Sequence, residues 1–219
     1  MTCAILARCA DTGQLGVALV SSLMAVTGRC AFVQAQVGAV AVQSMADPRL
    51  GPAALKMLAN GYRPEAVLRA FNRTEEGFDY RQMALINGSG DTAVHEASVA
   101  AGLTGAAEGE NCAAIGNRLV DGAVPERMIE VFVRTRGELG DRLVASLKTA
   151  VAEAGAGPAR AAGLLIAEHE PWPLVDLRID WSDDPVAGLE HLWHLWRPQM
   201  RNYLERALDP ATAVGAERS

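Results

Sequence analysis

The stretch MTCAILARCADTGQLGVALVSS, residues 1–22, opens the chain with two apolar runs separated by the turn cluster Asp11-Thr12-Gly13. Short β-rich runs on either side of such a cluster are typical of an antiparallel hairpin. A turn centred near Thr12 or Gly13 places Thr2 opposite Ser22 or Leu23. The start of the first strand is therefore expected beside the end of the second.

Thr2 heads this first strand and directly follows Met1. Methionine aminopeptidases remove an initiator when the next residue is as small as threonine, and removal leaves an α-amine beside the Thr2 hydroxyl. The two groups form a nucleophile and a base, because the amine is neutral often enough near pH 7 to accept the hydroxyl proton. The hydroxyls of Ser21 and Ser22 are candidates for orienting that amine and relaying protons. A Met-Thr start and a serine pair at a strand end are also ordinary features.

The composition of the 219 residues, half of them hydrophobic, predicts one domain over residues 1–208 and a flexible tail over 209–219. A net charge of -6 without a basic cluster argues against nucleic acid and anionic membranes as partners. No apolar run is long enough to span a membrane, and the start lacks the features of a signal peptide. Four dispersed cysteines without a C-x-x-C pair favour a cytoplasmic protein with reduced thiols.

The rest of the chain alternates between strand-like and helical blocks. Continuous apolar runs such as residues 38–42 and 164–166 indicate strands buried on both faces. Helices between mainly antiparallel strands then favour an α+β fold, a four-layer αββα sandwich. A two-layer α+β sandwich is the alternative. The predicted strands cover 37–44, 82–86, 91–95, 111–116, 163–166 and 174–179, a Gly-rich loop covers 102–109, and helices cover 50–58, a segment from 64, 124–134, 139–153 and a segment from 184.

Several stretches of the chain match one known family when they are taken together. They are Met1-Thr2 with its strand, LGVALVSS with Ala25-Val26, residues 37–52, Tyr80-Arg81-Gln82, Gly116-Asn117 and residues 172–193. In this combination the chain resembles an Ntn-hydrolase-like family, known as domain of unknown function 1028. The resemblance implies the αββα sandwich and an N-terminal threonine nucleophile, which here is Thr2, and it leaves the substrate open. Relatives usually carry a Ser-Ala pair where this chain has Arg160-Ala161. If that serine belongs to the active site, it is lost here or replaced by Arg160; the alternative is that the change marks a different substrate.

Further polar residues are candidates for the site. Asn117, after a strand and a glycine, can donate to a developing oxyanion, or it can hold its own turn. Arg29, in the loop beyond the serine pair, can bind a substrate carboxylate, or it can be a solvated loop residue. Asp47 precedes a predicted helix, and a capping role is favoured over substrate binding. Tyr80 and Arg81 open a strand and line either the cleft or the surface.

Two other clusters are weaker candidates. His191 and His194, beside Glu190, have a spacing that can hold a metal, but they alternate with leucines and tryptophans, which favours packing. We therefore expect no metal and no cofactor. Cys3 lies next to Thr2, but on an alternating strand it points to the opposite face, as a structural thiol.

Three functions are compatible with these residues. The first is a hydrolase of a small amide or related C–N bond, with an acyl-enzyme on Thr2 and Asn117 or backbone N–H groups holding the oxyanion. The others are a non-catalytic relative that binds a metabolite and an oligomeric structural protein. The apolar C-terminal helices predict a homodimer or higher homo-oligomer. Their large side chains are Leu189, Leu192, Trp193, Leu195, Trp196, Met200, Tyr203, Leu204 and Leu208.

Overall fold

The structure, a computed structural model, describes residues 1–153, 155 and 157–211. The strands are β1 (Thr2–Arg8), β2 (Leu15–Ser21), β3 (Ala31–Gln34), β4 (Gly38–Ser44), β5 (Arg81–Asn87), β6 (Thr92–His95), β7 (Leu103–Gly109), β8 (Cys112–Leu119), β9 (Ala161–Ala167) and β10 (Val175–Ile179). The helices are α1 (Thr27–Cys30), α2 (Leu50–Ala59), α3 (Pro64–Thr74), α4 (Val124–Arg134), α5 (Leu139–Glu153), α6 (Pro185–Trp196) and α7 (Met200–Leu208), with a 3-10 turn at Phe78–Tyr80.

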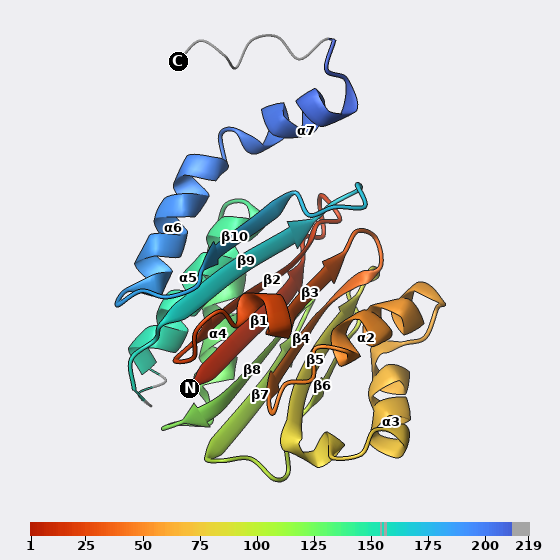
Figure 1. The fold of residues 1–219 in the computed structure, drawn as a ribbon, viewed down its shortest axis with the longest axis vertical. Helices are drawn as coiled ribbons and strands as arrows, with labels where there is room; N and C mark the ends of the chain where they lie inside the picture. Colours follow the sequence, from red (N-terminus) through yellow and green to blue (C-terminus); the bar gives the residue numbers. More distant parts are fainter. Residues whose placement is uncertain (154, 156, 212–219) are drawn as a thin grey trace.

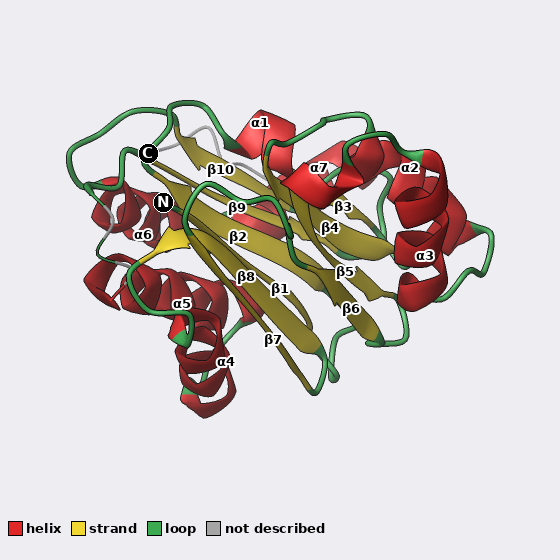
Figure 2. Ribbon diagram, turned by 90° about the horizontal axis from the view of Figure 1, so that it is seen from below, coloured by secondary structure: helices red, strands yellow, loops and turns green. Residues whose placement is uncertain are grey.

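The strands form two antiparallel sheets that pack face to face. One sheet has the order β10-β9-β2-β1-β8-β7, and the other has the order β3-β4-β5-β6. Helices α4, α5 and α6 cover the outer face of the larger sheet, and α2 and α3 cover the outer face of the smaller one (Figures 1 and 2). The predicted four-layer αββα sandwich is confirmed.

Alternation along β1 distributes its side chains between two hydrophobic cores. Cys3, Ile5 and Ala7 pack into the core under α4 and α5, whereas Ala4 and Leu6 pack between the two sheets. A third core lies between the smaller sheet and its helices. Since neighbouring residues of a strand point to opposite faces, Thr2 belongs to the inter-sheet face, and the predicted opposite orientation of Cys3 is found.

Three local predictions need correction. Thr2 pairs with Ser21 rather than with Ser22 or Leu23, because the hairpin turn centres about one residue earlier than expected. The segment expected as a Gly-rich loop is strand β7, because its backbone completes the edge of the larger sheet beside β8. Arg29 lies in the short helix α1 rather than in a loop.

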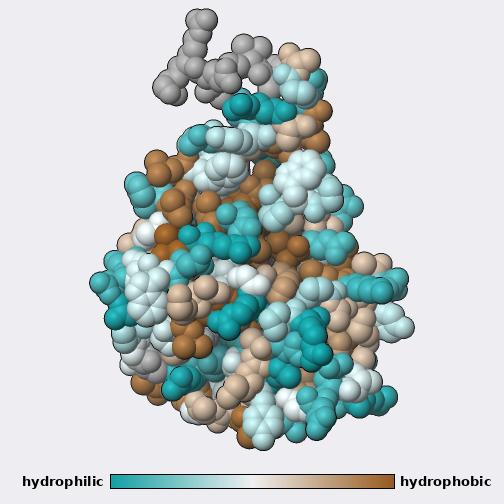
Figure 3. All heavy atoms as spheres, in the orientation of Figure 1, coloured by the Kyte–Doolittle hydropathy of each residue, from teal (hydrophilic) through white to brown (hydrophobic). Residues whose placement is uncertain are grey.

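The C-terminal helices contribute to the core only in part. Leu189 and Trp193 are buried under the larger sheet, and the Trp196 indole N–H donates to the Leu174 carbonyl at 3.1 Å. Leu195 and Tyr203 are about half exposed, and Figure 3 shows apolar surface below the C-terminal segment, interrupted by polar groups. The predicted oligomer through these helices stays a prediction. Most of the tail expected at 209–219 lies outside the described residues. Within the described part of the chain, no helix combines the length and apolarity needed to cross a membrane.

Candidate active site

A single row of residues crosses five strands of the larger sheet at the head of β1. Thr2 stands directly opposite Ser21 on β2 and Asn117 on β8, and the row continues to Ala161 on β9 and Thr104 on β7. Directly opposed residues share one face of a sheet. Three polar side chains of this row, from Ser21, Thr2 and Asn117, therefore point toward the smaller sheet, and all three are buried. Asn117 is inside β8, not after a strand as expected.

The hydroxyl of Thr2 belongs to a chain of hydrogen bonds. Its Oγ1 lies 2.8 Å from Ser21 Oγ, which accepts from the Leu23 N–H at 3.1 Å and lies 3.3 Å from the Met1 carbonyl oxygen. Either hydroxyl can be the donor in the Thr2–Ser21 pair, because the single Ser21 proton can go to Thr2 or to the Met1 carbonyl. The Met1 carbonyl also accepts from the Ser22 N–H at 2.9 Å. The Ser22 Oγ in turn accepts from the Met1 amine at 2.8 Å. Ser21 thus contacts the Thr2 hydroxyl and the carbonyl of the Met1–Thr2 peptide bond. Ser22 contacts the same carbonyl and the Met1 amine.

Two glutamines from the smaller sheet complete the floor of the site. Gln82 on β5 donates through Nε2 to the carbonyls of Gly105 and Gly116, each at 3.0 Å. Its Oε1 accepts from Nε2 of Gln43 on β4 at 2.7 Å, and Gln43 Nε2 also donates to the Thr2 carbonyl at 3.2 Å. This network links the two sheets directly at the backbone of Thr2.

Neither glutamine is among the site residues predicted from the sequence, although the sequence contains a signal for both. Ala39 and Ala41 face the inter-sheet core, so Gln43 has the same parity on β4. Ala84 and Ile86 on β5 give Gln82 the same assignment. A polar residue at an inward position of an otherwise apolar strand is expensive unless it is hydrogen-bonded, and it therefore marks a site of interest.

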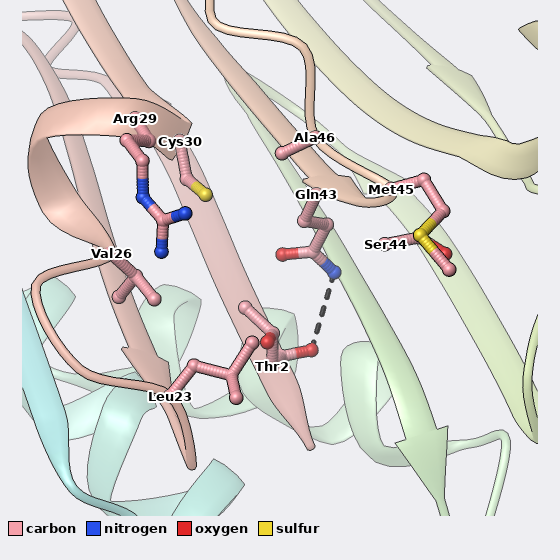
Figure 4. A pocket seen from close by; sticks show the side chains of 9 residues that line it. All are labelled: Thr2, Leu23, Val26, Arg29, Cys30, Gln43, Ser44, Met45 and Ala46. Carbon is pink, nitrogen blue, oxygen red and sulfur yellow. Dashed lines mark hydrogen bonds between the residues drawn. The ribbon is translucent and has the colours of Figure 1, made fainter.

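Thr2 lines two hollows. The Gln43 cavity, of about 320 Å³, opens between α1 and the end of β4 (Figure 4). The Asn117 hollow, of about 170 Å³, shares Thr2, Leu23, Ser44 and Met45 with the Gln43 cavity. The Gln43 cavity is lined by Thr2, Leu23, Val26, Arg29, Cys30, Gln43, Ser44, Met45 and Ala46; the Asn117 hollow is lined by Met1, Thr2, Ser22, Leu23, Ser44, Met45, Ala101, Asn117 and Arg118.

Backbone strain gathers around these hollows. Ser44 has a φ of 68° and Arg118 a φ of 53°, and Ala25, in the loop that leads to α1, has a φ of 51°. The left-handed conformation costs a non-glycine residue about 1–2 kcal/mol. Such strain persists only where the surrounding structure imposes it, and it concentrates at functional sites.

The predicted binding residues divide into one that reaches the site and three that do not line it. The guanidinium of Arg29 lies on the α1 side of the Gln43 cavity (Figure 4). Asp47 accepts from the Arg49 side chain and, at 3.0 Å, from the Arg49 N–H, so it shapes the entry to α2 without capping it directly. These bonds lower the pKa of Asp47 to about 2. Arg81 binds Asp47 and the Met45 carbonyl behind the cavity wall, and Tyr80 is about half exposed on the surface.

Arg160, the residue in place of the usual serine, turns away from Thr2. Its guanidinium pairs with Asp183 and lies over the Trp181 ring, 5.4 Å from the ring centre. Its backbone N–H donates to the Ser21 carbonyl at 2.7 Å. The Arg160 backbone therefore helps to fix the strand that carries Ser21, while its side chain lines neither hollow.

Burial changes the acidity of the groups next to Thr2. Burial, with the nearby Arg118 cation, lowers the pKa of the Met1 amine. On the other face of β1, burial raises the pKa of the Cys3 thiol to about 12, which makes it a poor nucleophile near neutral pH. In the described part of the chain, no three His, Cys, Asp or Glu side chains gather into a metal site.

The fold and the site define a four-layer αββα sandwich with a buried threonine at the head of a central inner strand. The chain belongs to the family of unknown function DUF1028, whose model matches residues 2–189. A crystal structure of a Silicibacter pomeroyi protein of the same family is similar, with 28% identity and a TM-score of 0.84 over 92% of this chain and 89% of that one.

A more distant similarity is to Anbu, an ancestral β-subunit, from Yersinia bercovieri. The two chains share 13% identity and a TM-score of 0.38, with 93% of this chain and 97% of the other covered. This similarity is too low to support an argument about fold or function. No curated protein matches the chain.

Proposed function

We propose that the protein is an N-terminal-nucleophile hydrolase that cleaves a small amide or a related C–N bond through an acyl-enzyme on Thr2. The observation that carries the proposal is the 2.8 Å hydrogen bond between Thr2 Oγ1 and the buried Ser21 Oγ, beside two hollows that Thr2 lines. Strand pairing on both sides fixes this hydroxyl, and a preorganised nucleophile reduces the cost of reaching the transition state.

The reaction requires the Met1–Thr2 bond to be cleaved, so that Thr2 gains a free amine. Met1 is only 3% exposed, so the proposal requires its removal before the N-terminus has folded into place. Loss of the Met1 carbonyl releases the Ser21 hydroxyl proton and the Ser22 N–H from their present acceptor. Both groups then face the new amine and can orient it.

In the proposed first step, Thr2 Oγ1 attacks the substrate carbonyl carbon while the Thr2 amine takes the hydroxyl proton. The C–N bond then breaks, and the leaving nitrogen receives that proton. A water molecule, deprotonated by the same amine, hydrolyses the ester and restores Thr2. Asn117 is suited to hold the oxyanion, because in the described structure its amide makes one long hydrogen bond, 3.5 Å to Gln82 Oε1.

The electrostatic surroundings support this use of the amine. A base must be neutral to accept a proton, and burial together with the Arg118 cation lowers the pKa of the Met1 amine. Thr2 is buried as well, and it lines the Asn117 hollow together with Arg118. We expect the pKa of the Thr2 amine to be lowered for the same reasons, which increases its neutral fraction near pH 7.

A metabolite-binding protein without hydrolytic activity is the second candidate. It is favoured by the well-packed state of Met1, whose amine donates to Ser22 Oγ at 2.8 Å. While Met1 is in place, the Thr2 nitrogen is part of a peptide bond and cannot act as a base. The two candidates therefore differ in whether the Met1–Thr2 bond is cleaved.

The test is a screen of small amides, lactams and N-acyl amino acids against protein whose N-terminus has been defined by intact mass. We expect turnover only from chains that begin at Thr2. Thr2→Ala should abolish turnover without loss of the fold, and Thr2→Ser should retain part of it because hydroxyl and amine both survive. Undiminished turnover in Thr2→Ala would contradict the proposal.

A further inference from the structure

Gln43 presents an unpaired acceptor to the cavity beside Thr2. The carbonyls of Gly105 and Gly116 occupy both N–H groups of Gln82, so its Oε1 must face Gln43. Gln43 must then direct its own Nε2 toward Gln82 and the Thr2 carbonyl. Figure 4 shows the remaining atom, Oε1, turned away from Thr2 toward the middle of the cavity.

This acceptor is costly in the free protein. The side chain of Gln43 is 98% buried, and its Oε1 has no hydrogen-bond partner in the described structure. A buried acceptor without a partner costs about 1–3 kcal/mol, so natural proteins rarely contain one without a reason. A ligand N–H group placed in the cavity would remove that cost.

The charges of the two hollows point to an anionic ligand. Arg29 is the charged side chain of the Gln43 cavity and Arg118 that of the Asn117 hollow, and neither lining includes an Asp or Glu. The Arg29 side chain makes no ion pair in the described structure, and its one hydrogen bond there is a 3.5 Å contact with the Met24 carbonyl. In a chain with a net charge of -6, this local positive charge is opposite to the average.

We propose that the Gln43 cavity binds the amino-acid half of an N-acyl amino acid, with Gln43 Oε1 accepting the amide N–H and Arg29 binding the carboxylate. The inference rests on the proposed hydrolase and names its substrate class. The cavity has room for about ten water molecules, which suits a single amino acid rather than a peptide.

The position of Asn117 agrees with a ligand amide whose N–H points to Gln43. A trans amide directs its C=O and its N–H to opposite sides. Gln43 offers an acceptor in one hollow, Asn117 offers a donor in the other, and Thr2 lines both. An amide bound across Thr2 would thus direct its N–H to Gln43 and its carbonyl oxygen to Asn117.

The experiment measures binding by calorimetry in the Thr2→Ala protein, where hydrolysis does not interfere. The probes are N-acetylglycine, N-acetylsarcosine, which lacks the N–H, and N-acetylglycinamide, which lacks the carboxylate. We expect N-acetylglycine to bind best and each analogue to bind about tenfold more weakly. Arg29→Gln should remove the preference for the carboxylate, and the matched control Arg73→Gln, on an exposed position of α3, should not.

Gln43→Met should remove the preference for N-acetylglycine over N-acetylsarcosine, because methionine has a similar length but no strong acceptor. If this variant does not fold, the comparison of the two ligands in the Thr2→Ala protein still decides. Equal affinity for N-acetylglycine and N-acetylsarcosine would overturn the role of Gln43. Equal affinity for N-acetylglycine and N-acetylglycinamide would overturn the role of Arg29. Absence of binding by all three probes at millimolar concentration would overturn the substrate class. If the binding preferences for the N–H and the carboxylate are found but protein that begins at Thr2 does not hydrolyse N-acyl amino acids, the proposed hydrolase activity is refuted and the binding site is not.

Discussion

The two faces of β1 give the adjacent residues Thr2 and Cys3 very different chemical surroundings. On the face toward the smaller sheet, Thr2 contacts serine, asparagine and glutamine groups and borders two hollows. On the face toward the helices, Cys3 is fully buried among apolar residues, and burial raises its pKa to about 12. Cysteine is intrinsically the better nucleophile. Under the proposed mechanism, position within the sandwich rather than intrinsic nucleophilicity decides which of these two adjacent side chains reacts.

After the loss of Thr2 itself, the largest expected effect on turnover is on the polar face of β1, at Asn117. If its amide stabilises the oxyanion, Asn117→Ala should lower kcat roughly a hundredfold or more with little change in KM. The surface variant Asn60→Ala, at the end of α2, is the control and should change neither constant. Steady-state kinetics on any substrate found in the screen provides the measurement. A change confined to stability would return Asn117 to a structural role.

The apolar face should respond in stability and not in turnover. Ile5 is fully buried in the core under the helices, so Ile5→Ala should lower the free energy of unfolding by about 2–5 kcal/mol. Urea denaturation measures this loss, and kcat per folded molecule should be unchanged. A large fall in kcat with little loss of stability would mean that the two faces of β1 are not separate.

Thiol reactivity sharpens the contrast between the faces. Thiolate is the reactive form, so a high pKa protects Cys3 at pH 8. Burial alone would raise the pKa of Cys9, but hydrogen bonds with Thr12 and Asp11 outweigh it and lower that pKa. Iodoacetamide at pH 8 should therefore modify Cys9 first, as read from tryptic peptide masses. Modification of Cys3 at the rate of Cys9 would contradict this account of the apolar face.

The smallest effect on the site is expected from the C-terminal helices. Leu195→Glu places a charge on an exposed apolar position of α6 and should shift a homo-oligomer toward monomer. The control Val133→Glu, on α4, should leave assembly intact. Light scattering reports the mass, and turnover per chain should not change. A wild-type monomer at micromolar concentration would remove the oligomer hypothesis.

The architecture could be predicted from the sequence because many residues contribute to the pattern of apolar positions that marks each strand and helix. Apolar runs such as residues 38–42 and 164–166 proved to be strands β4 and β9, buried on both sides. The prediction of a loop at 102–109 was wrong, because glycine in this segment allows the strand β7 to pack closely against a neighbouring segment. A Cβ on Gly105 would lie 2.1 Å from the Gly122 carbonyl, so only glycine allows β7 to approach that loop. Composition alone does not distinguish glycines that make a loop from glycines that allow a strand to pack closely against its neighbour.

The site was less predictable because it depends on register and on contacts between sheets. A shift of one residue in a hairpin changes which serine shares a face with Thr2, and the structure assigns that position to Ser21. Gln43 and Gln82 lie 39 positions apart in sequence and stand directly opposite each other on β4 and β5. Their meeting with Thr2 follows from the stacking of the two sheets, which no local pattern encodes.

The most direct test of the account is to trap the acyl-enzyme and locate the modified atom. Active protein is quenched with acid during turnover and digested with trypsin, and the peptide that ends at Arg8 is fragmented. The account predicts a peptide that begins at Thr2 and carries the acyl group on Thr2. An active species that retains Met1, or an acyl group on Cys3, would contradict it.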